Sequence, residues 1–257
     1  MDTEPILIPI IPTPYNSKLT CLENYTQLDD EIEQYIEEEI FRPDRKIPLR
    51  TAKCVLVGPS SCGKTSLISR LGHNGHIMFN ERSPSMRIDY WIQDFEVFRV
   101  PFKLQIWDTI GSENVSKSFY RDAQAIMILF DLTKMDTLEE IKRYAEDILR
   151  SDPEEQLVFL IGCKKDLLSE AQCRTAEKQL EPILNELYAE YWPVSSLTGK
   201  NVQPLFSRVA ALSFLRIIHT EIEVMESFRH EAITLNPPDQ PEVIKKKRRS
   251  CLRCLLI

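Results

Sequence analysis

The segment Gly58-Pro59-Ser60-Ser61-Cys62-Gly63-Lys64-Thr65 decides how the rest of the chain is interpreted, because it fits the pattern G-x4-G-K-[ST]. It follows a short apolar run, Lys53 to Val57, and precedes Ser66-Leu67-Ile68, which is helical in character. Glycines let such a loop curl so that its N–H groups and the next helix's N-terminus face an anion. Lys64 is expected to reach the terminal phosphates, and the Thr65 hydroxyl is expected to ligate magnesium. The segment therefore predicts a cradle for a nucleoside triphosphate.

Chance is the alternative explanation of this pattern. Average residue frequencies produce it in roughly one chain in a hundred of this length. The apolar run before it and the helical text after it make coincidence a poorer explanation. Glycine is also scarce, with 7 in 257 residues, yet Gly58 and Gly63 both occupy this loop.

Outward from the loop, short apolar runs alternate with amphipathic segments. We expect strands near 53–57, 88–98, 101–107, 125–131, 157–162 and 191–195, with helices between most of them. This alternation predicts a doubly wound α/β sheet. A last helix is expected from about Val202 toward a breaker at Asn236-Pro237-Pro238.

Three parts of the chain differ in composition. Residues 1–50 are an N-terminal extension with an amphipathic acidic helix expected over 27–41, where apolar residues recur at helical spacing. Residues 51–230 are expected to form the α/β domain with its long last helix. Residues 231–257 are expected to be a flexible tail. The apolar positions of the 27–41 helix are Leu28, Ile32, Tyr35, Ile36 and Ile40.

Bulk composition argues against a membrane-spanning protein and against a fold held by disulfide bonds. Hydrophobic residues make up 43% and charged residues 28%, and no apolar run approaches the roughly 18 residues of a membrane span. Seven cysteines are an odd number and do not form a disulfide framework, so a reducing compartment is expected.

A second motif, Trp107-Asp108-Thr109-Ile110-Gly111, closes a predicted strand and has the form D-x-x-G. Asp108 is expected to hold magnesium through water, and the Gly111 amide to sense a γ-phosphate. The motif therefore predicts a switch segment.

Two further segments follow apolar strands, Cys163-Lys164-Lys165-Asp166 and Val194-Ser195-Ser196-Leu197. They look like the N-K-x-D and S-A-K base-recognition loops of Ras-superfamily proteins. Asp166 can accept hydrogen bonds from two donors on guanine, whereas adenine presents an acceptor on that edge. Alone, the first segment would be an ordinary solvated charge cluster. Its order after the other motifs indicates GTP and GDP, with Mg2+, as the cofactors.

The chain from about Ala52 to Phe214 resembles the Rab GTPases of the Ras superfamily, through the strings FKLQIWDTIG, FYRDAQAIMILFDL and EYWPVSSLTGKNV. The last string, with CKKD, is most similar to the Rab thirty-four and thirty-six branch. The resemblance implies a P-loop G domain with five helices and a six-stranded, mostly parallel sheet. It also implies a GTP/GDP switch in vesicle trafficking, with an exchange factor, an activating protein, a GDP-dissociation inhibitor or escort protein, a prenyltransferase and effectors as partners.

Several positions depart from the family pattern. Ser112 stands where a glutamine normally orients the attacking water, so slow intrinsic hydrolysis is expected. Ile110 is bulkier than the usual alanine. Ser85 aligns with the switch threonine and keeps a hydroxyl for magnesium. The alternative is that Ser85 is a plain loop residue, because Arg87 replaces a glycine and an altered loop path would move Ser85 away. Cys163 replaces an asparagine, a loss expected to cost about 1 to 3 kcal/mol of nucleotide binding.

These motifs define the expected site. Catalytic roles fall to Lys64, Gly111 and Ser112, and magnesium is expected at Thr65, Ser85 and Asp108. The expected nucleotide contacts are Gly58, Pro59, Ser60, Ser61, Cys62, Gly63, Lys64, Thr65, Ser66, Asp108, Gly111, Cys163, Lys164, Asp166, Ser195, Ser196 and Leu197.

The chain ends Cys254-Leu255-Leu256-Ile257, which fits a C-a-a-X prenylation box and favours geranylgeranyl. The basic run Lys245 to Arg249 adds attraction to an anionic leaflet, so a lipid anchor with a cytosolic pool is expected, at the cytoplasmic face of an intracellular or plasma membrane. Cys251 is a second candidate for lipidation. Nuclear targeting or nucleic-acid binding is the alternative for the basic run, and nucleic acid is not the expected partner.

A monomeric switch with slow GTPase activity is the leading interpretation. The rival is a non-hydrolysing or weakly binding pseudo-GTPase scaffold, motivated by Ser112, Ile110, Arg87 and Cys163 together. A phosphotransferase of the nucleotide-kinase type shares the phosphate loop but needs neither the CKKD segment nor a prenylation box.

Overall fold

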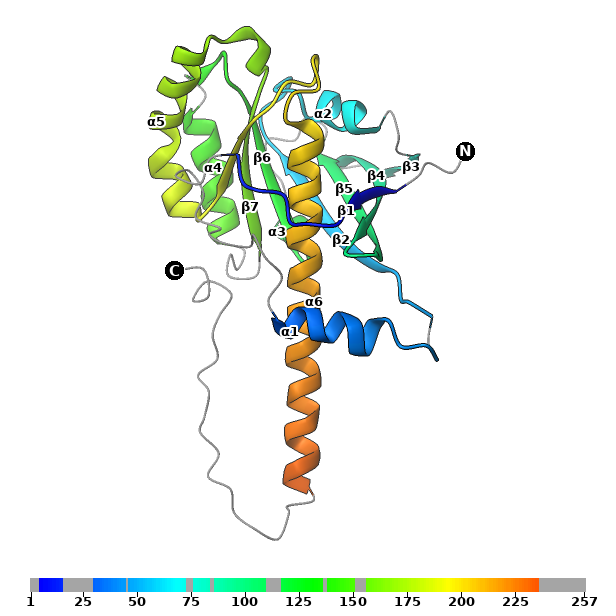
Figure 1. The fold of residues 1–257 in the computed structure, drawn as a ribbon. Coiled ribbons are helices and arrows are strands. Elements are labelled where there is room, and N and C mark those ends of the chain that lie inside the picture. Colours follow the sequence, from blue (N-terminus) through cyan, green and yellow to red (C-terminus); the bar gives the residue numbers. More distant parts are fainter. Residues whose placement is uncertain are drawn as a thin grey trace.

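The computed structural model describes residues 5–15, 30–44, 46–72, 76–83, 86–109, 117–135, 138–150 and 156–235. A single sheet runs through the molecule, with helices on both faces (Figure 1). The strands are β1 Ile6–Ile8, β2 Arg50–Val57, β3 His76–Ser83, β4 Met86–Val97, β5 Val100–Thr109, β6 Ala125–Asp131, β7 Leu157–Cys163 and β8 Glu190–Pro193.

The strand order is β1-β4-β5-β2-β6-β7-β8, with β3 beside β4. Neighbouring strands are parallel except where β4 pairs with β3 and β5. The mostly parallel, doubly wound sheet of a P-loop domain is therefore confirmed.

Six strands were predicted, whereas the described residues form a sheet of eight. All six predicted strands are present, and the additional ones are β1 and β3. β1 is only three residues long between prolines, so no alternation marks it. Both additional strands pair with β4, and a strand that depends on its partner for hydrogen bonds carries little signal of its own.

The described helices connect and cover these strands. They are α1 Asp30–Tyr35, the π-helical turn η2 Ile36–Ile40, α2 Lys64–Leu71, α3 Lys117–Tyr120, α4 Leu138–Leu149, the 3-10 turn η6 Lys165–Leu167, α5 Glu170–Leu187 and α6 Val202–Leu235. α5 begins with a capping box between Ser169 and Gln172. α6 ends directly before Asn236. Among the described helices, none combines the length and the apolar character needed to cross a membrane.

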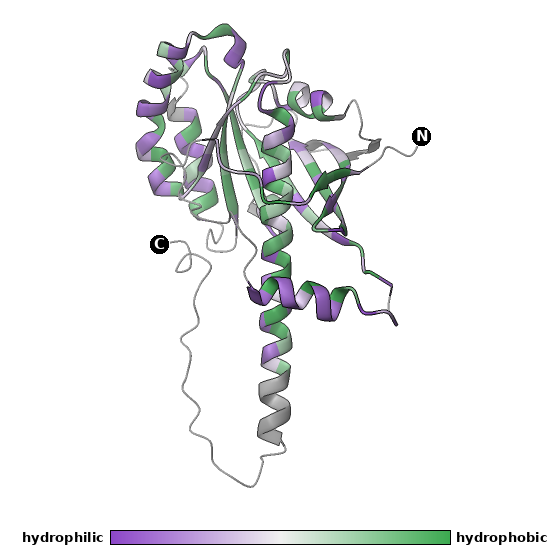
Figure 2. Ribbon diagram, viewed as in Figure 1, coloured by the Kyte–Doolittle hydropathy of each residue, from purple (hydrophilic) through white to green (hydrophobic). Residues whose placement is uncertain are grey.

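Two hydrophobic layers enclose the sheet. One contains α2 and α6 together with α1 and η2, and the other contains α3, α4 and α5. β6 and β7 are buried along their whole length, as expected for parallel strands covered on both faces. Figure 2 shows the resulting hydrophobic centre, and mixed polar and apolar turns on α4 and α5.

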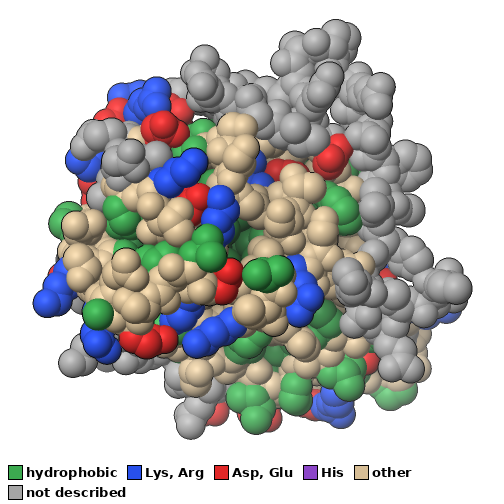
Figure 3. Space-filling view, turned by 90° about the horizontal axis from the view of Figure 1, so that it is seen from above, with side chains coloured by type: hydrophobic (Ala, Val, Ile, Leu, Met, Phe, Trp, Pro, Cys, Tyr) green, Lys and Arg blue, Asp and Glu red, His purple; other side chains and the backbone are tan. Residues whose placement is uncertain are grey.

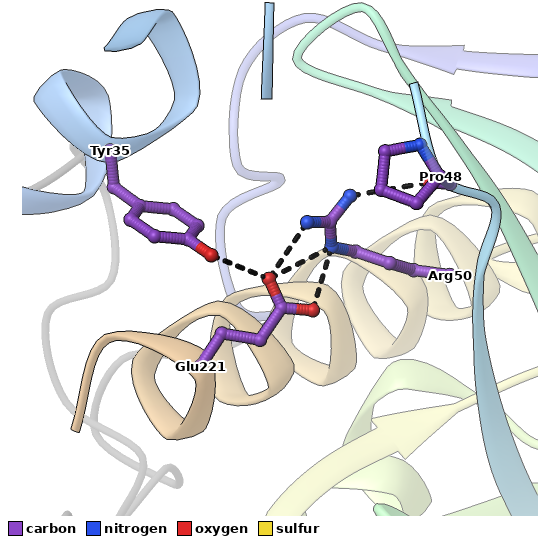
Figure 4. Close-up of polar contacts among 4 residues, drawn as sticks. All are labelled: Tyr35, Pro48, Arg50 and Glu221. Atoms are coloured by element: carbon purple, nitrogen blue, oxygen red, sulfur yellow. Dashed lines mark hydrogen bonds and ion pairs between the residues drawn. The ribbon is translucent and has the colours of Figure 1, made fainter. Parts of the chain in front are cut away.

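The N-terminal extension packs against α6 through β1 and through α1. In the predicted helix of 27–41, residues 30–40 are helical, and Ile32, Ile36 and Ile40 are buried. The Tyr35 hydroxyl donates to Glu221 at 3.1 Å, and Glu221 also accepts from Arg50 at 2.7 Å (Figure 4). The half of α6 beyond this crossing projects away from the sheet (Figure 1).

Candidate nucleotide-binding site

The phosphate loop connects the end of β2 to the start of α2. Gly58 has φ 146°, and a Cβ there would lie 2.1 Å from the Leu129 carbonyl oxygen, so only glycine fits. Gly63, at φ 120°, is the residue before α2. The Lys64 ammonium donates to the Gly58 and Pro59 carbonyls at 2.7 and 2.9 Å, which holds a buried positive charge over the loop.

A threonine and an aspartate meet beside this loop. Thr65, at the start of α2, donates through Oγ1 to Asp108 Oδ2 at 2.6 Å. Asp108 lies at the buried end of β5, next to the last residue of the strand and opposite Asp89 of β4. Burial raises the pKa of Asp108 above its usual value despite the Thr65 hydrogen bond.

The other carboxylate oxygen of Asp108 suits a cation. Among the described residues, Asp108 Oδ1 is buried and has no hydrogen-bond partner. An orphaned buried oxygen of this kind needs an explanation, and a hard cation with oxygen ligands supplies one. Thr65 and Asp108 therefore fit Mg2+, which would neutralise charge on a bound phosphate.

A lysine ties the first base-recognition segment to the phosphate loop. Lys164 has φ 62° directly before η6, and its ammonium donates to Asp131 Oδ2 at 2.6 Å and to the Ser61 carbonyl at 3.4 Å. Burial alone would raise the pKa of Asp131, but hydrogen bonds from Lys164 and Thr133 outweigh burial and lower it. Lys164 thus links the end of β7 to the end of β6 by an ion pair and to the phosphate loop by a hydrogen bond.

The second base-recognition segment holds Asp166 in place. The Ser195 hydroxyl donates to Asp166 Oδ1 at 2.5 Å, and the Lys165 N–H donates to the Val194 carbonyl at 3.0 Å. Ser195 is buried, whereas Asp166 is exposed. An oriented and accessible carboxylate is what recognition of two neighbouring N–H donors requires. Leu197 is also exposed, so its side chain is open to a ligand's ring.

Cys163 occupies the position of the replaced asparagine and is buried. Its Cβ and Sγ lie 3.5 and 3.6 Å from the point where a Cβ on Gly63 would stand. Burial raises the pKa of this thiol well above its usual value, so it is a neutral packing residue beside the phosphate loop.

Most expected contacts therefore gather at one end of the sheet. The loop between β8 and α6 lies at the upper end of Figure 1, and Figure 3 looks down on that end, where basic, acidic and apolar side chains lie close together. Six expected residues or segments lie outside the described residues: Ser85, Ile110, Gly111, Ser112, the basic run 245–249, and the Cys251 and Cys254 pair. The Arg87 side chain is also not described.

The sequence did not identify two supports of the site. Asp131 closes an apolar run, and that position at a strand end was the available signal. The second support is Tyr15, whose hydroxyl accepts a 3.2 Å hydrogen bond from Lys165. Nothing in the sequence near Tyr15 points to this contact, which spans 150 positions.

Comparisons with known proteins agree with this geometry. The model of the Ras family matches residues 53–214. Ras-related protein Rab-36 of Mus musculus is 44% identical over 179 residues, which cover 68% of this chain and 66% of that protein. Rab-36 of Homo sapiens is 39% identical, covering 81% and 80%. Ras-related protein Rab-34 of Sus scrofa is also 39% identical, covering 80% and 81%.

Proposed function

Because this chain belongs to the Ras family and is a divergent Rab GTPase, we propose that it binds GTP and GDP at the site around Lys64, Asp108 and Asp166 and acts as a switch in vesicle trafficking. In the GTP-bound state it recruits effectors. An exchange factor, an activating protein and a GDP-dissociation inhibitor or escort protein control the cycle.

The convergence of three separate loops supports this proposal most strongly. The buried Lys64 ammonium suits phosphate oxygens, and the Thr65 and Asp108 pair suits Mg2+. Asp166, oriented by Ser195, is accessible to the donor edge of guanine. Phosphate, metal and base recognition thus come from residues distant in the sequence, as a guanine nucleotide requires.

The hydrolysis rate depends on Ser112 in this proposal. A serine hydroxyl reaches less far than a glutamine amide and orients an attacking water poorly, so intrinsic turnover is slow. Gly111 and Lys64 retain their family roles. An activating protein that supplies both an arginine and a glutamine restores turnover.

A single-turnover experiment tests the proposal. The purified protein is loaded with labelled GTP and magnesium, and bound nucleotide and released phosphate are followed beside a Ser112→Gln variant. We expect tight retention of GTP with slow release of phosphate, and faster release in the variant. Equal rates in the two proteins would contradict the assigned role of Ser112.

The packing of Cys163 favours a second candidate function. The family's asparagine gives this position polar atoms, and the buried thiol supplies only a weak donor. A pseudo-GTPase scaffold would bind nucleotide weakly and hydrolyse none. Failure of both wild-type protein and Ser112→Gln to retain GTP, with restored retention in Cys163→Asn, would favour this scaffold.

Membrane attachment is proposed through Cys254, with Cys251 as a second lipid site and the 245–249 basic run as the electrostatic partner. A prenyltransferase is the implied modifying partner. A Cys254→Ser variant is expected to move from the membrane fraction to the cytosolic fraction of cells. Unchanged membrane association would contradict the proposed anchor.

A further inference from the structure

Residues 5–15 form an extended strap that reaches from one edge of the sheet to the other. At one end, β1 pairs with β4 through Ile6–Phe95 and Ile8–Val97. At the other end, Tyr15 packs on β8, the last strand of the sheet. The dark blue segment in Figure 1 follows this course past α6.

The strap is close to its full length. From β1, where the strap leaves the sheet edge, to β8 there are six strand spacings of about 4.8 Å, or roughly 29 Å. The seven residues 9–15 can span at most about 25 Å when fully extended, and the Tyr15 ring, rather than its backbone, makes the contact with β8. A segment with so little slack holds both edges of the sheet at once.

The middle of the strap is fastened to α6. Ile8 and Ile11 are buried in the hydrophobic layer that contains α6. The Pro12 carbonyl accepts a 2.8 Å hydrogen bond from Arg208 Nη1. Arg208 is itself held by Glu190 of β8, so the strap is anchored on a rigid part of the domain.

Tyr15 ends the strap at the base-recognition segments. Its ring lies edge-on to Tyr191, with centroids 6.3 Å apart, and 6.2 Å from Trp192. Tyr191 and Trp192 belong to opposite hydrophobic layers, so the ring covers the open edge of β8. The Ser195 segment begins immediately after this strand.

The same side chain contacts the first base-recognition segment, Cys163 to Asp166, directly. The Lys165 ammonium donates to the Tyr15 hydroxyl at 3.2 Å and lies 5.3 Å from the centre of its ring. Lys165 is buried and precedes Asp166 directly. Tyr15 therefore contacts the first base-recognition segment directly, and it supports the second through β8, the strand that leads into it.

We propose that Tyr15 is a positioning residue for guanine recognition, and that the strap formed by residues 5–15 slows nucleotide dissociation by keeping the two base-recognition segments together. This proposal rests on the proposed function of the site as a guanine-nucleotide site. It gives the N-terminal extension a role in nucleotide retention, in addition to any partner it binds. A partner that displaces the strap would speed nucleotide exchange.

The experiment uses the full chain loaded with fluorescent GDP and chased with excess unlabelled GDP. Tyr15→Ala is expected to speed dissociation by about threefold to tenfold, the effect of losing edge-to-face contacts and one hydrogen bond. Tyr15→Phe keeps the ring contacts and is expected to give a smaller increase. Leu7→Ala is the matched control, because Leu7 lies in the same strap with an exposed side chain.

A second readout separates positioning from general destabilisation. Inosine diphosphate lacks the exocyclic amine that a correctly placed Asp166 would bind, so the ratio of GDP to inosine diphosphate affinity reports on that carboxylate. Tyr15→Ala is expected to lower this ratio. Ile40→Ala, a buried change in the extension's helix against α6, is expected to lower thermal stability and leave the ratio unchanged.

The outcomes are distinguishable. Unchanged dissociation and an unchanged affinity ratio in Tyr15→Ala, in a protein that retains GDP, would overturn the role of Tyr15 alone. An equal acceleration by Ile40→Ala would overturn it as well, since general loosening would then explain the effect. Wild-type protein that retains no guanine nucleotide would overturn the proposed function and this proposal with it.

Discussion

A buried ion pair gives the sharpest test of how the domain is held together. Glu190 of β8 and Arg208 of α6 are both 0% exposed, and the guanidinium donates to the carboxylate at 3.0 to 3.2 Å. Trp192 Nε1 donates to the same carboxylate at 2.6 Å. The Glu190→Gln change keeps an oxygen for Trp192 and removes the charge that faces Arg208.

The magnitude follows from the complete burial of both partners. Removing one partner of a buried ion pair costs about 3 to 5 kcal/mol, because the remaining charge is left uncompensated. That is a large part of a domain's free energy of unfolding, which is roughly 5 to 15 kcal/mol. For a domain of this size, each 1 kcal/mol corresponds to about 2 to 4 °C in Tm, so a fall of about 6 to 20 °C is expected.

Urea and thermal unfolding of the nucleotide-free protein measure this loss. The control is Glu186→Gln, which makes the same change at an exposed position of α5 and should be nearly neutral. A Glu190→Gln/Arg208→Met double variant should recover part of the loss, because neither charge is then buried alone. A loss below about 1 kcal/mol in Glu190→Gln would refute the reasoning.

Three further predictions concern the site and the extension. Gly58→Ala should abolish binding of fluorescent GDP in a titration while far-UV circular dichroism is kept, because the added Cβ would meet the Leu129 carbonyl at 2.1 Å. Burial raises the pKa of Asp108, so its ionised form destabilises the folded, metal-free protein. The urea midpoint of unfolding should therefore rise as the pH falls from that raised pKa to about 4, the pKa of an aspartate in the unfolded chain. The Asp108→Asn variant should lack this rise. Glu221→Gln removes the negative charge that faces the buried Arg50; it should lower the free energy of unfolding in urea by about 1 to 3 kcal/mol and speed limited proteolysis before residue 50.

The sequence predicted the sheet and the site well where a local pattern reflects a local cause. The phosphate loop requires glycine at Gly58 because of its backbone angle and the approach of Leu129, so the motif and the geometry are the same constraint. The apolar runs of β6 and β7 are continuous because both faces of these strands are covered. Motif order assigned Asp166 and Ser195 to two base-recognition segments, and the structure joins these residues by a hydrogen bond.

The features that the sequence missed depend on distant partners. β1 is a strand because β4 offers a free edge, which Ile6-Leu7-Ile8 alone does not reveal. In the sequence, Arg208 is one more polar residue on a predicted helix. Its burial against Glu190 becomes evident only in the packed structure. The contact of Tyr15 with Lys165 joins the first and third quarters of the chain. Neither hydrophobic periodicity nor motif spacing predicts such a long-range contact.

The loss of the family's asparagine at Cys163 also gains a physical explanation from these distant contacts. A buried thiol cannot join the loops around a nucleotide by strong hydrogen bonds, so other residues must hold them. Lys164 connects the phosphate loop to Asp131, and the Ser195 hydroxyl fixes Asp166. Tyr15 adds a contact from outside the domain's own motifs. The N-terminal extension therefore adds a hydrogen bond at the base-recognition end of the sheet, where the buried Cys163 thiol offers only a weak donor.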